Sequence, residues 1–268
     1  MALSRSSRSK GIGEIVRTIV FAVAIAVVVR TFLYEPFNIP SGSMKPTLLV
    51  GDYLFVSKFA YGYSRHSLPF SPPFGDGRVF GALPERGDVA VFKLPSNNRT
   101  DYIKRIVGLP GDRIQVKQGV LYINDQEVTR EPIDDFVDDS PGGRTSCTLF
   151  QDSDNAPTHT VKRFRETMPA FGEGTEPVSY TVLDECPEGN GDYDNTDVFT
   201  VPEGHVFAMG DNRDNSLDSR AKVGYVPVEN LVGRAEIIFF STNGSARLWE
   251  VWKWPITVRY GRLFNLID

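Results

Sequence analysis

Hydrophobic positions divide the chain into an apolar N-terminal segment and a long body of short, alternating stretches. Residues 19–29 are eleven consecutive uncharged apolar residues, and residues 12–33 extend the segment to 22. A helix of about 20 residues spans the hydrocarbon core of a bilayer, and Arg17 and Arg30 lie close enough to its ends to reach the headgroups. The pattern predicts a single transmembrane anchor over residues 12–33.

A cleaved secretory signal is the alternative interpretation, because basic residues followed by an apolar run also introduce such signals. Residues 30–36, directly after the run, lack the small-residue pattern of a cleavage site, so we favour the uncleaved anchor. Residues 1–17 carry a charge of +3 and the whole chain −5, which leaves −8 for the rest. Basic flanks stay in the cytoplasm, so we expect residues 1–11 there and the body from Glu35 onward across the membrane. An acidic body argues against nucleic acid as a partner.

The body after residue 33 has no long stretch with the period of a helix. Short runs rich in Val, Ile, Phe and Tyr are separated by Gly, Pro, Asn and Asp, a pattern typical of antiparallel strands and hairpins. The predicted strands are 52–57, 88–92, 102–107, 113–117 and 120–124, with turns at Gln118-Gly119 and Asn124-Asp125. The predicted fold class is therefore mainly β, with one N-terminal transmembrane helix.

Residues 127–197 differ in composition, since aspartates crowd them and glycine-rich loops interrupt them. A calcium-binding site is the functional hypothesis for such clusters of aspartates. Neither 152–157 nor 192–197 begins a loop with the sixth-position Gly and twelfth-position Glu of an EF-hand, so we predict solvated acidic loops and no metal. We interpret 127–197 as an inserted β and loop subdomain between 34–126 and 198–268, the two parts of the β core.

The two cysteines, Cys147 and Cys186, both lie in this insertion, on the side of the membrane where disulfides form. Neither has the basic or histidine neighbours that activate a reactive thiol. We therefore predict a disulfide, which the chain-entropy treatment values at about 4 kcal/mol.

The C-terminal residues 248–255 hold three tryptophans among basic residues. This composition suits the headgroup layer of a bilayer, and it also suits a buried aromatic strand. The sequence alone does not separate the two.

Candidate chemistry begins in residues 37–48, where Ser41 and Ser43 lie in a loop restricted by Pro40 and Pro46. A serine nucleophile needs a base, and the usual base is histidine. No histidine has an aspartate orienter in an evident motif, and the chain has neither a Gly-x-Ser-x-Gly elbow nor a Ser-x-x-Lys pair at these serines. The three histidines are His66, His159 and His205. A Ser-His-Asp triad stays open, because geometry rather than sequence order defines it, and a lysine base is the option that we favour.

Lys104 is the lysine whose neighbours best fit that role, since it lies in an otherwise apolar run. If the run alternates as a strand, Lys104 and Arg105 face opposite sides, and one of them meets a more apolar environment. At its ordinary pKa only roughly one lysine in 2,500 is neutral at pH 7, but burial away from carboxylates lowers that pKa by several units. Lys45, nearer to Ser43 in sequence, lies in a polar loop, and we expect it to be solvated.

Four stretches together carry a specific resemblance. They are Pro-Ser-Gly-Ser-Met-Lys-Pro-Thr-Leu from Pro40, Gly-Asp-Val-Ala-Val-Phe from Gly87, Asp-Tyr-Ile-Lys-Arg-Ile-Val-Gly-Leu-Pro-Gly-Asp from Asp101, and Gly-Asp-Asn-Arg-Asp-Asn-Ser-Leu-Asp-Ser-Arg from Gly210. In this order after one anchor they closely resemble the boxes of bacterial type I signal peptidases, also called leader peptidases, over residues 36–112 and 200–235. The resemblance implies two antiparallel β-sheet domains and a serine endopeptidase with a Ser-Lys dyad. It also implies removal of signal peptides from exported preproteins at the periplasmic face of the bacterial inner membrane.

The resemblance implies a role for each matching residue. Ser43 matches the nucleophile and Lys104 the general base, Ser41 matches a hydroxyl of the oxyanion hole, and Ser216 matches the hydroxyl that orients the lysine. Supporting ion-pair positions are Arg105, Asp211, Asp218 and Arg220. Apolar pocket positions, expected to admit small residues of an Ala-x-Ala site, are Phe37, Ile39, Met44, Leu48, Tyr102 and Ile103. The implied partners are signal peptides and inner-membrane lipid, with no cofactor, metal or nucleic acid.

Two other function classes stay open on the sequence. A catalytically silent, membrane-anchored β-domain could bind extended polypeptides along a sheet edge. A metal hydrolase could be built on Asp211, Asp214 and Asp218.

Overall fold

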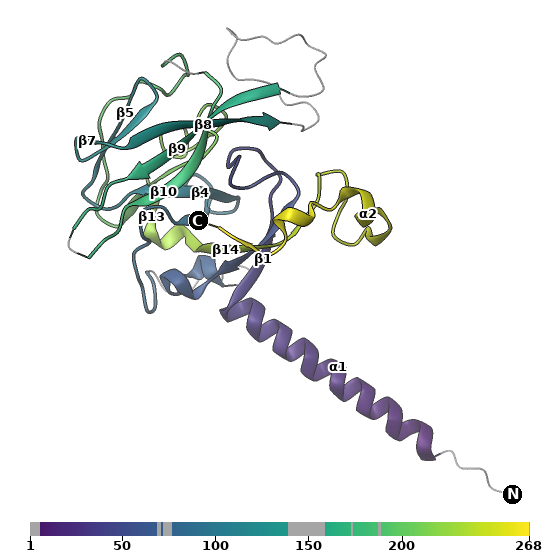
Figure 1. Cartoon of the computed structure of the whole chain (residues 1–268). Coiled ribbons are helices and arrows are strands. Elements are labelled where there is room, and N and C mark those ends of the chain that lie inside the picture. The colour runs from purple at the N-terminus through teal and green to yellow at the C-terminus, as the bar shows by residue number, and fades with distance from the viewer. Residues whose placement is uncertain are drawn as a thin grey trace, which may run out of the picture.

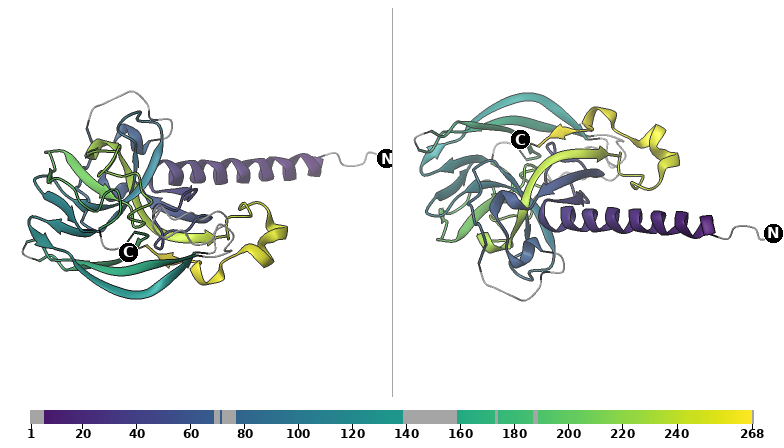
Figure 2. Two further views of the ribbon diagram at one scale, coloured as in Figure 1. Left: turned by 90° about the horizontal axis from the view of Figure 1, so that it is seen from above. Right: turned by 90° about the horizontal axis from the view of Figure 1, so that it is seen from below.

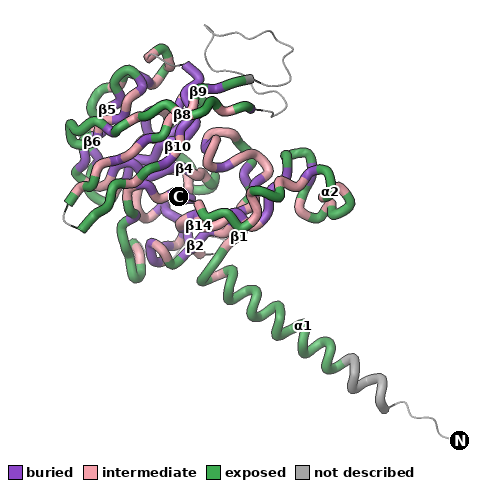
Figure 3. The backbone as a smooth tube through the Cα atoms, in the orientation of Figure 1, coloured by how far each residue is buried: buried purple, intermediate pink, exposed green. Residues whose placement is uncertain are grey.

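The computed structural model describes residues 6–68, 71, 77–138, 159–172, 174–186 and 189–267, with only the backbone for residues 6–12 and His159. Helix α1 (Ser6–Phe32) projects alone from a β body, as Figure 1 shows. Within the described residues, Gly13–Phe32 is the one helical stretch long and apolar enough to cross a membrane, and none of it is buried against the body. Figure 3 shows the same contrast, with an exposed α1 against buried strands.

The largest sheet has eight strands, in the order β1-β2-β14-β3-β4-β12-β13 with β15 paired to β14. All of its pairings are antiparallel. The long strand β14 runs between β2 and β3, so this strand from the C-terminal half of the chain joins the two N-terminal hairpins. The strands of this sheet are β1 (Tyr34–Asn38), β2 (Asp52–Ser57), β3 (Val89–Lys93), β4 (Asp101–Gly108), β12 (His205–Met209), β13 (Val226–Pro227), β14 (Leu231–Ser241) and β15 (Asn265–Leu266).

Two smaller antiparallel sheets cover the rest of the body. A four-stranded sheet follows the order β11-β5-β6-β7, and a three-stranded sheet follows β10-β9-β8. Their strands are β5 (Arg113–Lys117), β6 (Val120–Ile123), β7 (Gln126–Glu127), β8 (Thr129–Asp138), β9 (His159–Met168), β10 (Val178–Asp184) and β11 (Phe199–Thr200). The short helices are η1 (Phe59–Tyr61), η2 (Arg65–Ser67), η4 (Val228–Asn230), η5 (Val251–Lys253), α2 (Trp254–Thr257) and η6 (Tyr260–Arg262).

The observed elements confirm the mainly β fold class. Strands β2 and β5 have the predicted bounds, and β3, β4 and β6 differ from theirs by a residue at one or both ends. Both predicted turns have two successive residues with positive φ, 49° and 79° at Gln118-Gly119 and 52° and 65° at Asn124-Asp125. That conformation matches the right-handed twist of the strands it joins.

Two hydrophobic clusters explain how the body positions its loops. One combines Ile114 and Leu121 with Val182 and Phe207, so β5, β6 and β12 share a core with β10 from the segment predicted as an insertion. The other places Met44 and Leu48 against Leu54, Val56 and Val91, directly under the serine loop. That loop is therefore anchored by its own apolar side chains.

Some predictions fall outside the described residues. Cys147 lies there, so the disulfide stays a prediction, although Cys186 is buried just beyond β10. The acidic stretch 152–157 also lies there. The tryptophan-rich segment, by contrast, is described: Trp249 and Trp252 are 65% and 70% exposed, which disfavours a buried strand. Figure 2 shows this C-terminal segment extending from the body toward the side on which α1 leaves it.

Candidate active site

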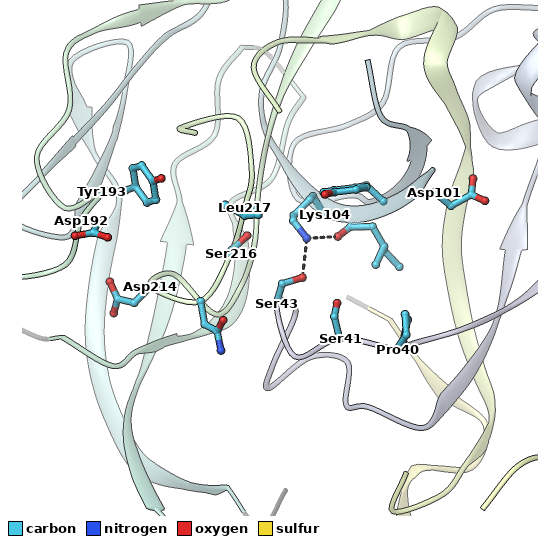
Figure 4. Close-up of a pocket in the computed structure, with 13 residues that line it drawn as sticks. Pro40, Ser41, Ser43, Asp101, Lys104, Asp192, Tyr193, Asp214, Ser216 and Leu217 are labelled. Carbon is cyan, nitrogen blue, oxygen red and sulfur yellow. Dashed lines mark hydrogen bonds between the residues drawn. The ribbon is translucent and has the colours of Figure 1, made fainter. Parts of the chain in front are cut away.

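Ser43 lies in the loop between β1 and β2. Ile39 N donates to Asp52 O at 2.9 Å and Leu48 N to Met44 O at 2.8 Å, which closes the loop into tight turns. Met44 and Leu48 are buried beneath it, whereas Ser43 is half-buried and Ser41 is exposed. Figure 4 shows both hydroxyls on the same side of this loop, facing strand β4. The two serines are thus presented by a fixed backbone.

Lys104 reaches this loop from the middle of β4. Its register partner on β3 is Ala90, and the Lys104 residue is 3% exposed. The Nζ atom lies 2.7 Å from Ser43 Oγ and 2.9 Å from Ile103 O, the two contacts drawn in Figure 4. The structure therefore brings together the two residues predicted as nucleophile and base, 61 positions apart in sequence.

Burial lowers the pKa of Lys104 to about 8, because the interior disfavours the charged amine. Asp218 and Asp211 act in the opposite direction through space. Each of those carboxylates is bound directly to an arginine, so neither holds the lysine as an ammonium partner. With a pKa near 8, about one Lys104 in ten is neutral at pH 7, several hundredfold more than for an exposed lysine.

Arg105, on the opposite face of β4, is fully buried and held by Asp211. Its Nε and Nη2 atoms lie 2.9 and 2.8 Å from the two carboxylate oxygens of Asp211, and its Nη1 donates to Gly87 O at 2.7 Å. The Thr47 hydroxyl donates to the same carboxylate at 2.6 Å. This bidentate pair fixes β4 to the serine loop and to the loop that begins at Asp211.

The segment from Gly210 to Arg220 forms the other wall of the site. Asp218 accepts from Arg220 at 3.0 and 2.9 Å and from Gly210 N at 3.0 Å. Burial alone would raise the pKa of Asp218, but Arg220 and the Gly210 N–H outweigh it, so the pKa is lowered. All four predicted ion-pair residues therefore form two buried pairs beside Lys104.

The absence of a side chain at Gly210 lets this wall approach the serine loop closely. A Cβ atom there would lie 2.2 Å from Ser216 Oγ and 2.6 Å from Ser43 O, so no larger residue fits. Ser216 is buried at the cavity wall, but among the described residues its hydroxyl makes no hydrogen bond of good geometry, to Lys104 or otherwise. It lies near enough to Asp218 to help lower that pKa. The predicted orienting contact to Lys104 is not formed here.

The serine and the lysine open into a cavity of about 560 Å³. Of the six predicted pocket residues, Tyr102 and Ile103 line it; Ile39, Met44 and Leu48 are buried below the loop, and Phe37 packs against the same cluster. The full lining is Pro40, Ser41, Ser43, Asp101, Tyr102, Ile103, Lys104, Asp192, Tyr193, Asp214, Asn215, Ser216 and Leu217.

Sequence reasoning gave no cavity role to Asp192 and Tyr193, which come from residues interpreted as an acidic loop. The only sequence signal around them is a cluster of glycines and aspartates, and such a cluster indicates a loop rather than a functional site. Asp214 belongs to the Gly210 stretch and was named only as a metal ligand. Its carboxylate accepts from Glu185 N at 2.7 Å and Cys186 N at 2.9 Å, while burial and then Asp184 raise its pKa to about 7.

The expectation for Lys45 was wrong. The residue is buried, and its Nζ lies 2.5 Å from an oxygen of Asp138 at the end of β8. The loop is polar in sequence, but the lysine stem folds back over Gly42 into the interior.

The arrangement offers little to the other catalytic classes. His66 packs in η2 with its pKa lowered by burial, and neither it nor the half-buried His205 lines the cavity. Across the described ranges, no three His, Cys, Asp or Glu side chains are placed to hold a metal. What the geometry can do is transfer a proton from the Ser43 hydroxyl to a neutral Lys104 amine.

Known proteins are similar in sequence to this chain over most of its length. A family profile described as "Signal peptidase, peptidase S26" matches residues 12–240. The chain belongs to the signal peptidase family. Signal peptidase I of Rickettsia canadensis (strain McKiel) is 39% identical over 246 residues, covering 90% of this chain and 84% of that protein. Signal peptidase I of Rickettsia typhi (strain ATCC VR-144 / Wilmington) is 41% identical over 225 residues, covering 83% and 78%.

A crystal structure of a signal peptidase I from Enterococcus faecalis V583 matches with a TM-score of 0.30 and 23% identity, over 57% of this chain and 97% of that one. Family membership confirms a serine endopeptidase of the signal peptidase type, as the four boxes implied. The matched range includes all of Gly13–Phe32, which is consistent with a membrane-anchored signal peptidase.

Proposed function

We propose that this signal peptidase cleaves the signal peptides of exported preproteins by a dyad in which Ser43 is the nucleophile and neutral Lys104 the general base. The observation that carries the proposal is the 2.7 Å contact between Lys104 Nζ and Ser43 Oγ at the edge of a cavity. The lowered pKa of Lys104, about 8, makes the amine available as a base near neutral pH.

The reaction follows from that contact in two halves. Lys104 accepts the Ser43 hydroxyl proton as Oγ attacks the scissile carbonyl carbon, and the resulting ammonium then donates a proton to the departing amine. Lys104, neutral again, next accepts a proton from water as the water oxygen attacks the acyl-serine carbonyl carbon. It then returns that proton to Ser43 Oγ as the bond to the acyl group breaks, which releases the signal peptide and restores the dyad. The Ile103 carbonyl, 2.9 Å from Nζ, favours the ammonium form between the two transfers.

An oxyanion hole is required at the tetrahedral stage. We assign it to the Ser41 hydroxyl and the backbone N–H of Ser43. In support, Ser41 lines the same cavity and points to the same side of the loop as Ser43 (Figure 4). A single donor of this kind contributes roughly a hundredfold to a thousandfold in rate.

Specificity for small residues of the Ala-x-Ala type is proposed from the cavity walls. Pro40, Tyr102 and Ile103 line the serine end, and the floor below the loop is already filled by Met44 and Leu48. A pocket closed off in this way rejects a large side chain by steric clash more strongly than it rewards a small one.

We further propose a single-pass protein of the bacterial inner membrane, with its N-terminus in the cytoplasm and its β body on the periplasmic face. The exposed apolar helix and the basic N-terminal residues support this topology. Trp249 and Trp252 are exposed, in a C-terminal segment that extends toward the side where α1 leaves the body (Figure 2), which favours contact of this segment with lipid headgroups. Anchoring enzyme and precursor in one bilayer raises their effective concentration.

The test is cleavage of a labelled precursor whose signal ends in Ala-x-Ala, by the full-length chain in lipid vesicles. Mass spectrometry maps the new N-terminus. We expect a cut after the second Ala, lost in Ser43→Ala and kept in Ser245→Ala, a matched change at an exposed serine. Cleavage that survives Ser43→Ala contradicts the proposal, and binding without any product supports the silent β-domain instead.

A further inference from the structure

The side chain of Lys45 crosses the turn that carries the two serines. A Cβ atom built on Gly42 would lie 3.1 Å from Lys45 Cε and 3.4 Å from its Cδ, so the lysine stem packs directly on the glycine. Met44 and Lys45 are both buried, although they follow the half-buried Ser43 immediately. The stem thus covers Gly42, the residue between Ser41 and Ser43.

The ammonium at the end of that stem is held from a distant part of the chain. Asp138, the last residue of β8, places a carboxylate oxygen 2.5 Å from Lys45 Nζ, and both side chains are only 8% exposed. The two residues are 93 positions apart. This ion pair joins the three-stranded sheet β10-β9-β8 to the serine turn.

The same sheet also reaches the turn through Asn212, a residue of the segment from Gly210 to Arg220. Asn212 donates from its backbone N to Ser43 O at 3.1 Å and from Nδ2 to Gly42 O at 3.3 Å. Asn212 in turn is bridged to Leu183 of β10 and donates to Glu185 Oε1 at 3.2 Å. The contacts made by Lys45 and by Asn212 thus both lead back to residues of the 127–197 segment.

We infer that Lys45 and Asp138 are positioning residues, through which the β10-β9-β8 sheet fixes the turn that presents Ser41 and Ser43. The inference rests on the proposed function, because it gives the pair a role in the same Ser43 reaction. Neither residue touches the reacting atoms. A buried ion pair adds little net stability over apolar residues of similar size, but it accepts only one geometry. That property suits a nucleophile, since a displacement of about 1 Å can cost a hundredfold in rate.

Asp138 also keeps a second amine occupied. Lys45 lies two residues from Ser43, and its ammonium is directed toward the Asp138 carboxylate. Paired with Asp138, it leaves the Ser43 hydroxyl to Lys104.

The test uses the full-length chain in vesicles and measures kcat, KM and the melting temperature of each variant. We expect Asp138→Asn to lower kcat by about tenfold or more with KM changed less than about threefold, because the turn is displaced rather than the substrate lost. The matched control is Asp135→Asn, on the same strand, whose 2.9 Å pair with Lys162 is exposed, and it should change kcat by less than about twofold.

The double variant Lys45→Met and Asp138→Leu separates positioning from stability. Removing both charges should return the melting temperature close to that of the wild type, while kcat stays low. Full kcat in Asp138→Asn overturns the inference, and so does a kcat that recovers together with the melting temperature in the double variant. Failure of the proposed function would show differently, as a wild-type chain that does not cleave or a Ser43→Ala variant that still does.

Discussion

Lys104 and Arg105 are neighbours on one strand and are both buried, but their side chains contact different groups. Lys104, 3% exposed, contacts a hydroxyl and a carbonyl, and its pKa falls to about 8. Arg105, fully buried, is gripped by Asp211, which outweighs burial and raises its pKa. Burial alone therefore does not decide protonation; a carboxylate in direct contact does.

Lys45 extends this comparison to a second amine on the serine turn itself. It is nearly as buried as Lys104 and much nearer to Ser43 in sequence, but it lies against Asp138. Of the two buried lysines near the nucleophile, only the one without a contacting carboxylate is suited to be a base. The following predictions test the difference between Lys104 and Arg105, which lie on the two faces of β4.

Lys104→Arg should have the largest effect. Arginine keeps the positive charge and can still donate hydrogen bonds, but it cannot be deprotonated in a protein. We expect kcat/KM on a labelled precursor to fall by about a thousandfold or more, since a general base supplies up to about ten-thousandfold. Lys162→Arg, at a mostly exposed lysine, should leave it unchanged. Substantial activity in Lys104→Arg would exclude the lysine as the base.

Arg105→Met should destabilise the protein by removing the ion pair on the other face of β4. It leaves Asp211 buried and charged without its partner, a change that costs about 3–5 kcal/mol in comparable pairs. Chemical denaturation at neutral pH measures the free energy of unfolding. The double variant Arg105→Met and Asp211→Leu should recover much of that loss. If the single and double variants are equally unstable, packing rather than charge explains the effect.

Lys104→Met should stabilise the protein at pH 7 while it inactivates it. The folded pKa of Lys104 is about 8 and the ordinary value 10.5, so the unfolded chain binds more protons between these pH values. Wild-type stability should therefore rise with pH across that window. The shift corresponds to about 3 kcal/mol, reduced by the lost contacts to Ser43 and Ile103. Denaturation curves at pH 7 and pH 10.5 should show the advantage of Lys104→Met disappear at the higher pH.

The sequence predicted those features of the site that depend on residues close together in the chain or on the recognised boxes. The alternation of 102–107 anticipated that Lys104 and Arg105 point to opposite sides, and the boxes anticipated that Lys104 would meet Ser43. It could not predict that Lys45 is buried, because its partner Asp138 lies 93 positions away and is brought there only by the pairing of β8. Asp192 and Tyr193 likewise line a cavity whose other residues are distant in sequence. The composition of a polar loop does not indicate which part of the protein the loop will contact.

The same limit applies to the fold. Hairpins such as β5-β6 were predictable from two residues of turn, whereas β14 could not be placed between β2 and β3 from its own pattern. Its position depends on which hairpin edges are still unpaired, and that is a property of the whole sheet. The predicted pocket residues Met44 and Leu48 illustrate the point within the site, because an apolar side chain near a nucleophile serves equally well as wall or as support.

The pH dependence of cleavage is the smallest predicted effect and the most direct probe of the Lys104 face. Only the neutral amine can accept the Ser43 proton, so kcat/KM should rise about tenfold per pH unit at low pH and level off above about pH 8. Initial rates on the labelled precursor between pH 6 and 10 give the profile. His66→Gln should leave the midpoint in place, because that imidazole lies outside the cavity. A midpoint that moves with His66, or one near the ordinary lysine value, would show that the buried amine is not the group being titrated.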